Sequence, residues 1–437
     1  MILYGRRFLK GAVAAGAILF LVLLVTGCFL SAPTGALVTP TIRAIGLPDA
    51  SIVNSVTLTV RGPGMDPVEV SYSSLPSTIN IAVPEGNDRV FELSVGLNRT
   101  FTENPAIPYT SYKGTAMADV TSDSAVVKLT MGIGSTKIIV PDTYNNRLVQ
   151  IDDMNGTGWT ELKGSDIASF GNIDSNFVPS DVDYDEYGNI YVANDVSSAL
   201  YGGIWRFTSI LDTTPVRVLS SGVNGMKAVA VDRKNDRIYG LYYNSQSAQD
   251  DVYYNDYTGS LGSLGAGVQF PYSSSFFANV YSITADEGGN IYLGGSGGNS
   301  DTVIEKYTMA GGTSQKTYSS GQPGSVMGMI ILDGTLYASI VYGTSDDRVE
   351  AFDADTLLHV PGTFSFGSYK ESPLPSEIGK FVGPHKFLAT LNDNLTIMDY
   401  NVTVSRLVSF DDISGSGWIT FGSSGIGDNQ FMFSGGW

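Results

Sequence analysis

The chain has 437 residues, a formal net charge of −18 and a single cysteine. An acidic surface repels phosphate backbones, which argues against nucleic acid as a partner, and one cysteine excludes a framework of disulfides within the chain. With 51 glycines, 24 tyrosines and 16 % charged residues, and without long stretches of helical period, the sequence predicts an all-β protein rich in turns.

The N-terminal end has the pattern of a secretory signal. MILYGRRFLK is basic and lacks acids, and a short apolar segment follows at residues 11–25. The stretch LVTGC resembles the lipobox of bacterial lipoproteins, in which the cysteine becomes the acylated N-terminus. This resemblance implies a signal peptide over residues 1–27 and a lipid on Cys28. An uncleaved anchor over residues 11–30 is the alternative, because about 20 apolar residues can span a bilayer.

Both alternatives tether the protein to the bacterial cell envelope, outside the cytoplasm, because positive charges stay on the cytoplasmic side. The membrane is therefore the first expected partner, reached through the N-terminal lipid. Phe29 follows the cysteine, where the inner-membrane retention signal of enteric bacteria has Asp. This difference slightly favours the outer membrane.

Two regions of short strands follow a tether at residues 28–37, which small residues and a proline make flexible. In the first region, residues 38–134, SVTLTVRGPGM alternates apolar and polar residues before a turn. STINIAVPEGNDRVFELSVG and SYKGTAMADVTSDSAVVKLTMG each look like two strands joined by a turn. Such spacing predicts an antiparallel β-sandwich, immunoglobulin-like or transthyretin-like, with no catalytic pattern.

The second region, residues 135–437, repeats one phrase. DEYGNIYVAND at residues 185–195 returns as DEGGNIYLGGS at residues 286–296, and looser copies are AVAVDRKNDRIYGLYY and GMIILDGTLYASIVYG. Each copy has an apolar strand, a turn and a second strand built on Ile-Tyr or Leu-Tyr. The turns are marked by Asp185, Asp232, Asp286 and Asp333. Four short strands in each roughly 40–55 residues are typical of β-propeller blades.

Two flanking segments bring the predicted count to six blades. KIIVPDTYNNRLVQIDD (residues 137–153) and HKFLATLNDNLTIMDYN (residues 385–401) are each expected to supply second and third strands. IIVPDTYNNRLVQID and VPSDVDYDEYGNIYVAND resemble the NHL repeat family, and the resemblance implies a six-bladed β-propeller. It is good in the first two blades and weaker in the others.

The ends of the propeller are predicted to meet. IDDMNGTGWTEL (residues 151–162) is echoed by FDDISGSGWITF (residues 410–421), and the following GSSGIGDNQFMFSGGW resembles the loop that leads NHL blades into their innermost strand. An open ring would leave strand edges exposed to aggregation. We therefore expect residues 430–437 to provide the inner strand of the blade that begins at residue 137.

A calcium loop is the first alternative for the acidic stretch DVDYDEYG, which contains Asp181, Asp183 and Asp185. An EF-hand needs Gly at its sixth place and Glu at its twelfth, where this chain has Glu186 and Val192. The other copies of the turn lack the extra acids. A hairpin turn is therefore favoured and no cofactor is expected, with calcium as the minor alternative.

The two histidines do not indicate a catalytic or metal site. His359 and His385 stand outside any zinc-binding or triad pattern.

Loops between second and third strands should share one rim of a propeller. They are rich in Tyr, Asn, Ser, Asp and Gly, which suit recognition, although propeller loops of any function can have this composition. The candidate binding residues on this rim are Tyr144, Asn146, Asn194, Tyr243, Tyr253, Tyr254, Asp301 and Tyr342.

The sequence favours a lipid-anchored envelope protein whose rim binds a protein, a peptide or a glycan. Two other functions stay open. Metal-dependent lactonases occur among propellers related to NHL modules, and the candidate ligands here would be Asp142, Asn146, Asn194 and Asp301. The third possibility is a structural spacer, since fold alone does not give function.

Overall fold

A computed structural model describes residues 36–45, 53–97, 111–123, 125–130, 132–133, 138–185, 189–220, 225–232, 235–244, 249–256, 267–274, 276–286, 288–332, 334–342, 347–360, 381, 384–388, 395–400, 404–410 and 418–433. The predicted signal peptide (residues 1–27) and Cys28 lie outside these ranges. The described chain is all-β apart from short 3₁₀ turns. No helix in it is long and apolar enough to cross a membrane.

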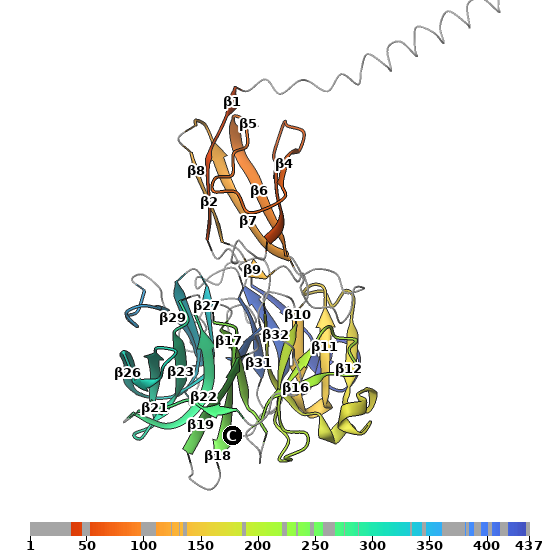
Figure 1. Ribbon diagram of the computed structural model, residues 1–437, viewed down its shortest axis with the longest axis vertical. Helices are drawn as coiled ribbons and strands as arrows, with labels where there is room; N and C mark the ends of the chain where they lie inside the picture. The colour runs from red at the N-terminus through yellow and green to blue at the C-terminus, as the bar shows by residue number, and fades with distance from the viewer. Residues whose placement is uncertain are drawn as a thin grey trace, which may run out of the picture.

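The N-terminal module forms a compact unit above the rest of the chain (Figure 1). Its largest sheet has the order β4-β3-β6-β7-β9. These strands span Val53–Arg61 (β3), Val68–Tyr72 (β4), Gly86–Leu97 (β6), Ser111–Val120 (β7) and Gly132–Ile133 (β9). Val56, Leu58 and Val60 alternate with more exposed neighbours along β3 and are completely buried. The predicted alternation therefore builds the core of this module.

Two pairings in this module differ from the predicted hairpins. Residues 111–130 contain two strands, as expected, but β8 (Val126–Thr130) leaves β7 and pairs parallel with β2 (Thr41–Ile45). In the predicted hairpin at residues 77–96, the strand before β6 is reduced to β5 (Val83–Pro84). This short strand pairs with β1 (Leu37–Val38). Both corrections have one cause: these strands find partners far away in the sequence, which local turn signals do not reveal.

The larger part of the molecule is propeller-like and consists of antiparallel sheets of three or four strands. The first sheets are β10 (Ile138–Asp142), β11 (Arg147–Ile151) and β12 (Thr160–Lys163); β13 (Pro179–Tyr184), β14 (Ile190–Asn194), β15 (Gly203–Phe207) and β16 (Val216–Leu219); and β17 (Ala228–Asp232), β18 (Arg237–Asn244), β19 (Gln249–Asp256) and β20 (Val268–Gln269).

The remaining sheets follow in chain order. They are β22 (Phe277–Ala285), β23 (Ile291–Gly297), β24 (Asp301–Tyr307) and β26 (Lys316–Pro323); β27 (Ser325–Leu332), β28 (Thr335–Val341) and β29 (Arg348–Asp353); and β30 (Pro384–Leu388), β31 (Leu395–Tyr400), β32 (Ser405–Phe410) and β33 (Ile419–Phe421). Short parallel pairs join β21 (Tyr272–Ser273) to β25 (Gly312–Thr313) and β34 (Ser423–Ser424) to β35 (Gln430–Phe431).

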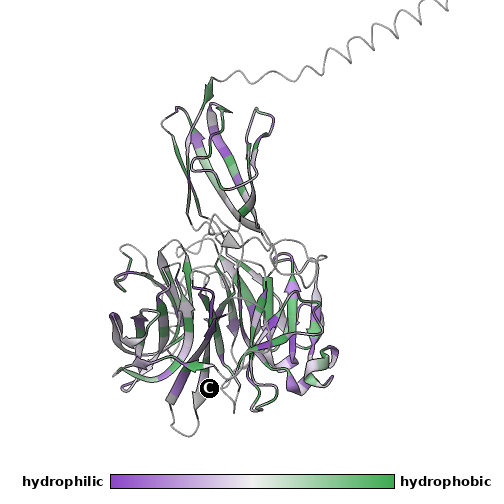
Figure 2. Ribbon diagram, in the orientation of Figure 1, coloured by the Kyte–Doolittle hydropathy of each residue, from purple (hydrophilic) through white to green (hydrophobic). Residues whose placement is uncertain are grey.

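The first strands of five sheets surround a central channel. β13 contacts β17, β17 contacts β22, β22 contacts β27, β27 contacts β30, and β30 returns to β13. Apolar residues run along the strands of both parts of the molecule (Figure 2). Because buried apolar clusters fill the spaces between neighbouring sheets, adjacent sheets hold one another in place.

The repeated phrase forms a self-contained turn. The Oδ1 atom of Asp185 accepts a hydrogen bond from the backbone of Asn189 at 2.8 Å. Its Oδ2 atom accepts hydrogen bonds from the Asn189 side chain at 2.5 Å and from the Tyr191 hydroxyl at 2.9 Å. The second copy repeats these contacts among Asp286, Asn290 and Tyr292. The spacing Asp-x-x-x-Asn-x-Tyr thus places three donors around one carboxylate.

Removing the hydroxyl from this turn should have a measurable cost. We expect Tyr191→Phe to lower the free energy of unfolding by about 1–2 kcal/mol, because a buried carboxylate loses one donor. Asp185→Ala should cost more, since it leaves the buried donors without their acceptor. Urea unfolding measures both free energies. The control is Tyr144→Phe, which removes the hydroxyl of an exposed tyrosine. Equal stability of the Tyr191 and Tyr144 variants would contradict this account.

The C-terminal segment, residues 422–433, contacts the end of the first sheet. Its Met432 makes the same backbone contacts there as Val178 makes at the end of the second sheet. In the second sheet, the Val178 N–H donates to Asn194 Oδ1 at 2.6 Å, directly before β13 begins. In the first, the Met432 N–H donates to Asp142 Oδ1 at 2.7 Å. The Met432 carbonyl also accepts from the Tyr144 N–H, as the Val178 carbonyl accepts from the Asp195 N–H. By this correspondence β10 matches β14, the second strand of its sheet. Of the expected inner strand at residues 430–437, Gln430–Phe431 form β35 and residues 434–437 lie outside the described residues.

The prediction for residues 385–401 was wrong by one strand. The order β30-β31-β32-β33 makes HKFL part of a first strand and LTIMDY the second, so this segment does not supply second and third strands. The cause is the contact of β30 with β27 and β13, which places it beside the channel.

Candidate functional site

The predicted rim lies on the face that points away from the N-terminal module. β10 starts close after β9, which pairs with β7 of that module, and ends at Asp142 on the far side. Figure 1 shows the labelled ends of β18 and β19 on the side of the molecule opposite the N-terminal module. We call this side the distal face. The predicted rim residues lie at the ends of their strands on this distal face. They are Tyr144, Asn146, Asn194, Asp301 and, at the end of β28, Tyr342.

Two predicted residues of the first turn differ in exposure. Tyr144 lies in the 3₁₀ turn Thr143–Asn145 and exposes 57 % of its surface. Asn146 ends this turn in the left-handed conformation, with φ at 52°, and its N–H donates to the Thr143 carbonyl. Asn tolerates this conformation better than most residues. Tyr144 is thus available to a partner, whereas Asn146 shapes the turn.

Asn194 and Asp142 are completely buried and hold the backbone. The Asn194 side chain donates to the carbonyls of Asn176 and Tyr201 at 3.0 and 2.9 Å, in addition to accepting from Val178. Asp142 Oδ2 accepts from Arg147 Nε at 2.8 Å. Both residues therefore fix the connections of their sheets. Asp301, at the start of β24, pairs across to Pro323, so the four candidate lactonase ligands are divided among three sheets, with Asp142 and Asn146 on the first.

The tyrosines at 253 and 254 do not lie in a loop. Residues 249–256 form β19, in which Tyr254 pairs with Tyr239 and stacks on the Arg237 guanidinium, 4.0 Å from the ring centre. Tyr253 meets the ring of Tyr242 edge-on, with ring centroids 6.1 Å apart. The backbone of Tyr243 is at the distal end of β18, and its side chain is outside the described set. The structure therefore separates Tyr253 and Tyr254 from the turn residues.

Tyr342 belongs to an ionic cluster rather than to an open surface. Its hydroxyl accepts from Arg348 Nη2 at 2.8 Å and lies 3.3 Å from Glu350 Oε1. Burial, followed by the charge of Glu350, raises the pKa of Tyr342 to about 12. At neutral pH this tyrosine is a neutral partner in the cluster.

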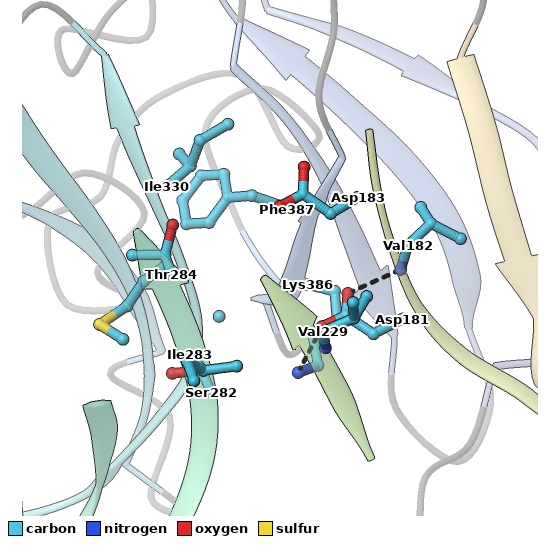
Figure 3. A pocket seen from close by; sticks show the side chains of 12 residues that line it. Asp181, Val182, Asp183, Val229, Ser282, Ile283, Thr284, Ile330, Lys386 and Phe387 are labelled. Atoms are coloured by element: carbon cyan, nitrogen blue, oxygen red, sulfur yellow. Dashed lines mark hydrogen bonds and ion pairs between the residues drawn. The ribbon is translucent and has the colours of Figure 1, made fainter. Parts of the chain in front are cut away.

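A small cavity opens in the central channel, lined by the first strands of five sheets (Figure 3). Asp181 Oδ2 lies 3.4 Å from Lys386 Nζ, and both side chains are 9 % exposed. Lys386 Nζ also donates to the Tyr281 carbonyl at 3.1 Å. Burial raises the pKa of Asp181, and the charge of Lys386 opposes this shift.

The cavity is too small for an organic substrate. Its volume is about 50 Å³, enough for a few water molecules, whereas small-molecule sites span about 300–1,000 Å³. Asp181 Oδ2 and Asp183 Oδ2 also accept hydrogen bonds from the backbone N–H groups of Val229 and Val231 at 3.2 and 2.8 Å. These carboxylates join neighbouring strands, which favours the distal face over the channel as a binding site.

Calcium should leave the stability of the protein unchanged. In the acidic stretch, Asp181 and Asp183 bind the next strand and Asp185 binds its own turn. Across the described residues, no three His, Cys, Asp or Glu side chains gather to hold a metal ion. We expect the melting temperature of the full chain to agree within about one degree in millimolar calcium and in chelator. A rise of several degrees, as about 2.7 kcal/mol of ligand binding would give, would support the lactonase alternative instead.

Sequence reasoning missed two features of this part of the molecule. Lys386 enters the channel from the short run PHKFL, where a lysine within an apolar strand was the only signal. The second feature is a set of exposed apolar side chains on the distal connections, namely Ile173, Leu200, Ile426 and Met432. Apolar residues in loops carry no sequence signal for exposure.

Comparisons with known proteins extend to the fold alone. No protein-family model matches the chain, and neither does any curated protein. Among solved structures, a protein of unknown function from Bacteroides thetaiotaomicron is 12 % identical with a TM-score of 0.43, and the match covers 92 % of each chain.

Two further structures are similar at a lower score. An auxiliary nutrient binding protein from Bacteroides ovatus is 15 % identical, with a TM-score of 0.36 and coverage of 84 % of this chain and 96 % of that one. YCF48 bound to D1 peptide is 7 % identical, with a TM-score of 0.36 and coverage of 67 % and 85 %. All these scores are below 0.5, so the function proposed next is argued from the residues of this chain.

Proposed function

We propose that the protein is a lipid-anchored binding protein of the bacterial cell envelope, which presents the distal face of a propeller to a protein or peptide partner. The observation that carries this proposal is the placement of two features at opposite ends. The lipobox-like LVTGC precedes the N-terminal module. Tyr144 is exposed after the end of β10 that is remote from that module, and its backbone contacts Met432 of the C-terminal segment. This arrangement would hold a recognition surface away from the membrane.

The proposal includes a finer architecture: a β-sandwich followed by a six-bladed, NHL-like propeller closed by the C-terminal segment. The sharing of one apolar core by the N-terminal sheets supports the sandwich. The contacts of Met432 with Asp142 and Tyr144 support the closure, because they repeat those of Val178 before the inner strand β13. The proposed inner strand at residues 430–437 extends beyond the described residues, which end at residue 433.

Lipidation can be tested at Cys28. We expect the full chain to take up a labelled fatty acid and to remain with membranes, whereas Cys28→Ser takes up none and is not processed at the lipobox. Thr34→Ser, in the tether, is the matched control and should behave like the natural chain. A Cys28→Ser protein that is processed normally would contradict the lipoprotein proposal. Equal size of the natural and variant chains, both unprocessed, would favour the anchor over residues 11–30.

The binding role can be tested by site-specific photo-crosslinking in intact cells. A crosslinking residue at Tyr144 should give discrete adducts on the distal face. The control position is Met117, which is 70 % exposed on the N-terminal module. Adducts from Met117 alone would favour the spacer. Absence of adducts from Tyr144, Asn146 and Asp301 would overturn the proposed binding face.

A further inference from the structure

Five apolar side chains are exposed on the distal connections of the first two sheets. Ile173 lies between β12 and β13, Leu200 lies between β14 and β15, and the others belong to the β10–β11 turn and the C-terminal segment. Their exposed fractions are 57 % for Tyr144, 51 % for Ile173, 69 % for Leu200, 76 % for Ile426 and 39 % for Met432. We call this set the distal apolar strip.

Backbone contacts connect the segments that carry the strip. The Tyr144 N–H donates to the Met432 carbonyl at 2.9 Å. Next to them, the Asn145 side chain donates to the carbonyl of Gly425, the neighbour of Ile426, at 2.9 Å. The strip therefore begins as one patch formed by the first turn and the C-terminal segment.

The same patch continues toward the second sheet. The Gly164 N–H donates to the Asn146 carbonyl at 3.4 Å, and the Ser165 N–H donates to Asp174 Oδ1 at 2.7 Å, which places Ile173 beside the first turn. Further along the same connection, the ring of Phe170 lies 6.2 Å from that of Tyr201, the neighbour of Leu200. Four segments far apart in the sequence thus bring their apolar residues to one side of the molecule.

Single exposed apolar residues are common on protein surfaces, but a series on adjoining segments is not. Each could have been polar without disturbing the packing, because none of the five belongs to a buried cluster. Covering such side chains contributes about 25 cal/mol for each Å² of apolar surface. Adjoining apolar residues on a rigid scaffold are a typical feature of a protein-binding surface.

Carboxylates surround the strip. Asp166, Asp174, Asp195 and Asp428 are exposed on the same connections. Desolvation by the surrounding protein raises the pKa of Asp195, and the charge of Lys227 opposes this shift. The nearby cations are fewer than the carboxylates: Lys163 lies 2.6 Å from Glu161, Arg217 Nη1 donates to the carbonyls of Ala199 and Leu200, and Lys227 acts on Asp195. The electrostatic field over the strip is therefore negative.

We propose that the distal apolar strip docks a protein segment that presents apolar side chains flanked by lysine or arginine. This inference rests on the proposed binding function and specifies its partner. The apolar residues would be buried at the centre of the interface, and the four carboxylates would meet the flanking cations at its rim. Anionic lipids and nucleic acid would be repelled by the same carboxylates.

The test uses the full chain in detergent and a fluorescent heptapeptide, Lys-Lys-Leu-Trp-Leu-Lys-Lys. One variant combines Tyr144→Ser, Leu200→Ser and Ile426→Ser. A matched variant combines Met117→Ser and Leu358→Ser, at residues that are 70 % and 67 % exposed elsewhere. We expect the natural chain and the matched variant to bind the peptide equally, and the strip variant to bind at least tenfold more weakly. Peptides with glutamate for lysine, or serine for leucine, should also lose at least tenfold.

Each other outcome would overturn the inference. Equal binding by the strip variant would place the peptide elsewhere. Equal binding of the serine peptide would reduce the interaction to net charge, and stronger binding of phosphatidylglycerol vesicles or of muropeptides would assign the strip to lipid or glycan. The two proposals fail separately: if Tyr144 gives adducts in cells but the peptide does not bind, the binding function stands and the partner chemistry is wrong. Loss of both would end the binding function as well.

Discussion

Replacing Arg147 with methionine is expected to lower the free energy of unfolding by about 3–5 kcal/mol. The guanidinium is almost completely buried and lies 2.8 Å from Asp142 Oδ2 and 2.5 Å from Glu161 Oε2. It also donates to the carbonyls of Gln430 and Gly427, at 2.8 and 3.2 Å. Methionine would leave the Asp142 carboxylate buried without its cation and would release the C-terminal segment from the first sheet.

Tryptophan fluorescence in urea is a suitable measurement. All four tryptophans follow residue 135, so the signal reports on the propeller-like part alone. The matched control is Arg237→Met, because Arg237 pairs at 2.6 Å with Asp256, whose side chain is 52 % exposed. The Arg237 side chain is itself 14 % exposed and stacks on Tyr254, but Asp256 remains in contact with water when the cation is removed. We therefore expect a smaller loss than for Arg147→Met. Similar losses in the two variants would contradict the special role of Arg147.

A truncation separates ring closure from local packing. If Arg147 stabilises the protein by holding the C-terminal segment, its replacement should cost much less in a chain that ends at residue 424. Contacting groups show such coupling, whereas distant groups have additive effects. The same loss in the full and truncated chains would show that Arg147 acts only through Asp142 and Glu161.

The parts of the fold that could be predicted from sequence are those encoded by neighbouring residues. The Asp185 turn was recognisable because its acceptor and both donors lie within seven consecutive residues. The same local repeat predicted the order of strands around the turns of Asp185 and Asp286, but it placed residues 385–401 one strand too late. By contrast, the parallel partner of β8 is β2, more than 80 residues earlier, and no local pattern specifies that pairing.

The candidate site was predictable only in part, because exposure depends on tertiary contacts. Tyr144 and Asn194 were both predicted to be binding residues on the rim, yet the first is exposed and the second is completely buried. The difference comes from residues 176–178 and 201, which enclose the Asn194 amide. The strip residues Ile426 and Leu200 were not predicted as binding residues, because their apolar side chains gave no reason to expect exposure. Both are nevertheless exposed to solvent.

Lys386 provides the second large expected effect. Lys386→Met should lower the free energy of unfolding by about 3–5 kcal/mol, because Asp181 keeps its burial and loses the cation 3.4 Å away. Adding Asp181→Asn should recover most of this loss, since residue 181 then carries no charge that needs a cation and the Val229 N–H keeps an acceptor at that position. A double variant no more stable than Lys386→Met would show that the lysine stem, rather than its charge, supports the channel.

The pair of Asp181 and Lys386 also predicts in which direction the free energy of unfolding changes with pH. Burial already raises the pKa of Asp181 in the folded protein, and removal of Lys386 should raise it further. Between the unfolded pKa of about 3.9 and the raised folded pKa, the folded state binds more protons than the unfolded state. Stability therefore rises as pH falls through the folded pKa, and Lys386→Met should gain more than the natural chain between pH 8 and pH 5. With Asp181→Asn added, this extra gain should vanish. If it persists, the titrating group is one of the other buried acids, and the pair of Asp181 and Lys386 is not the source of the channel's electrostatic stability.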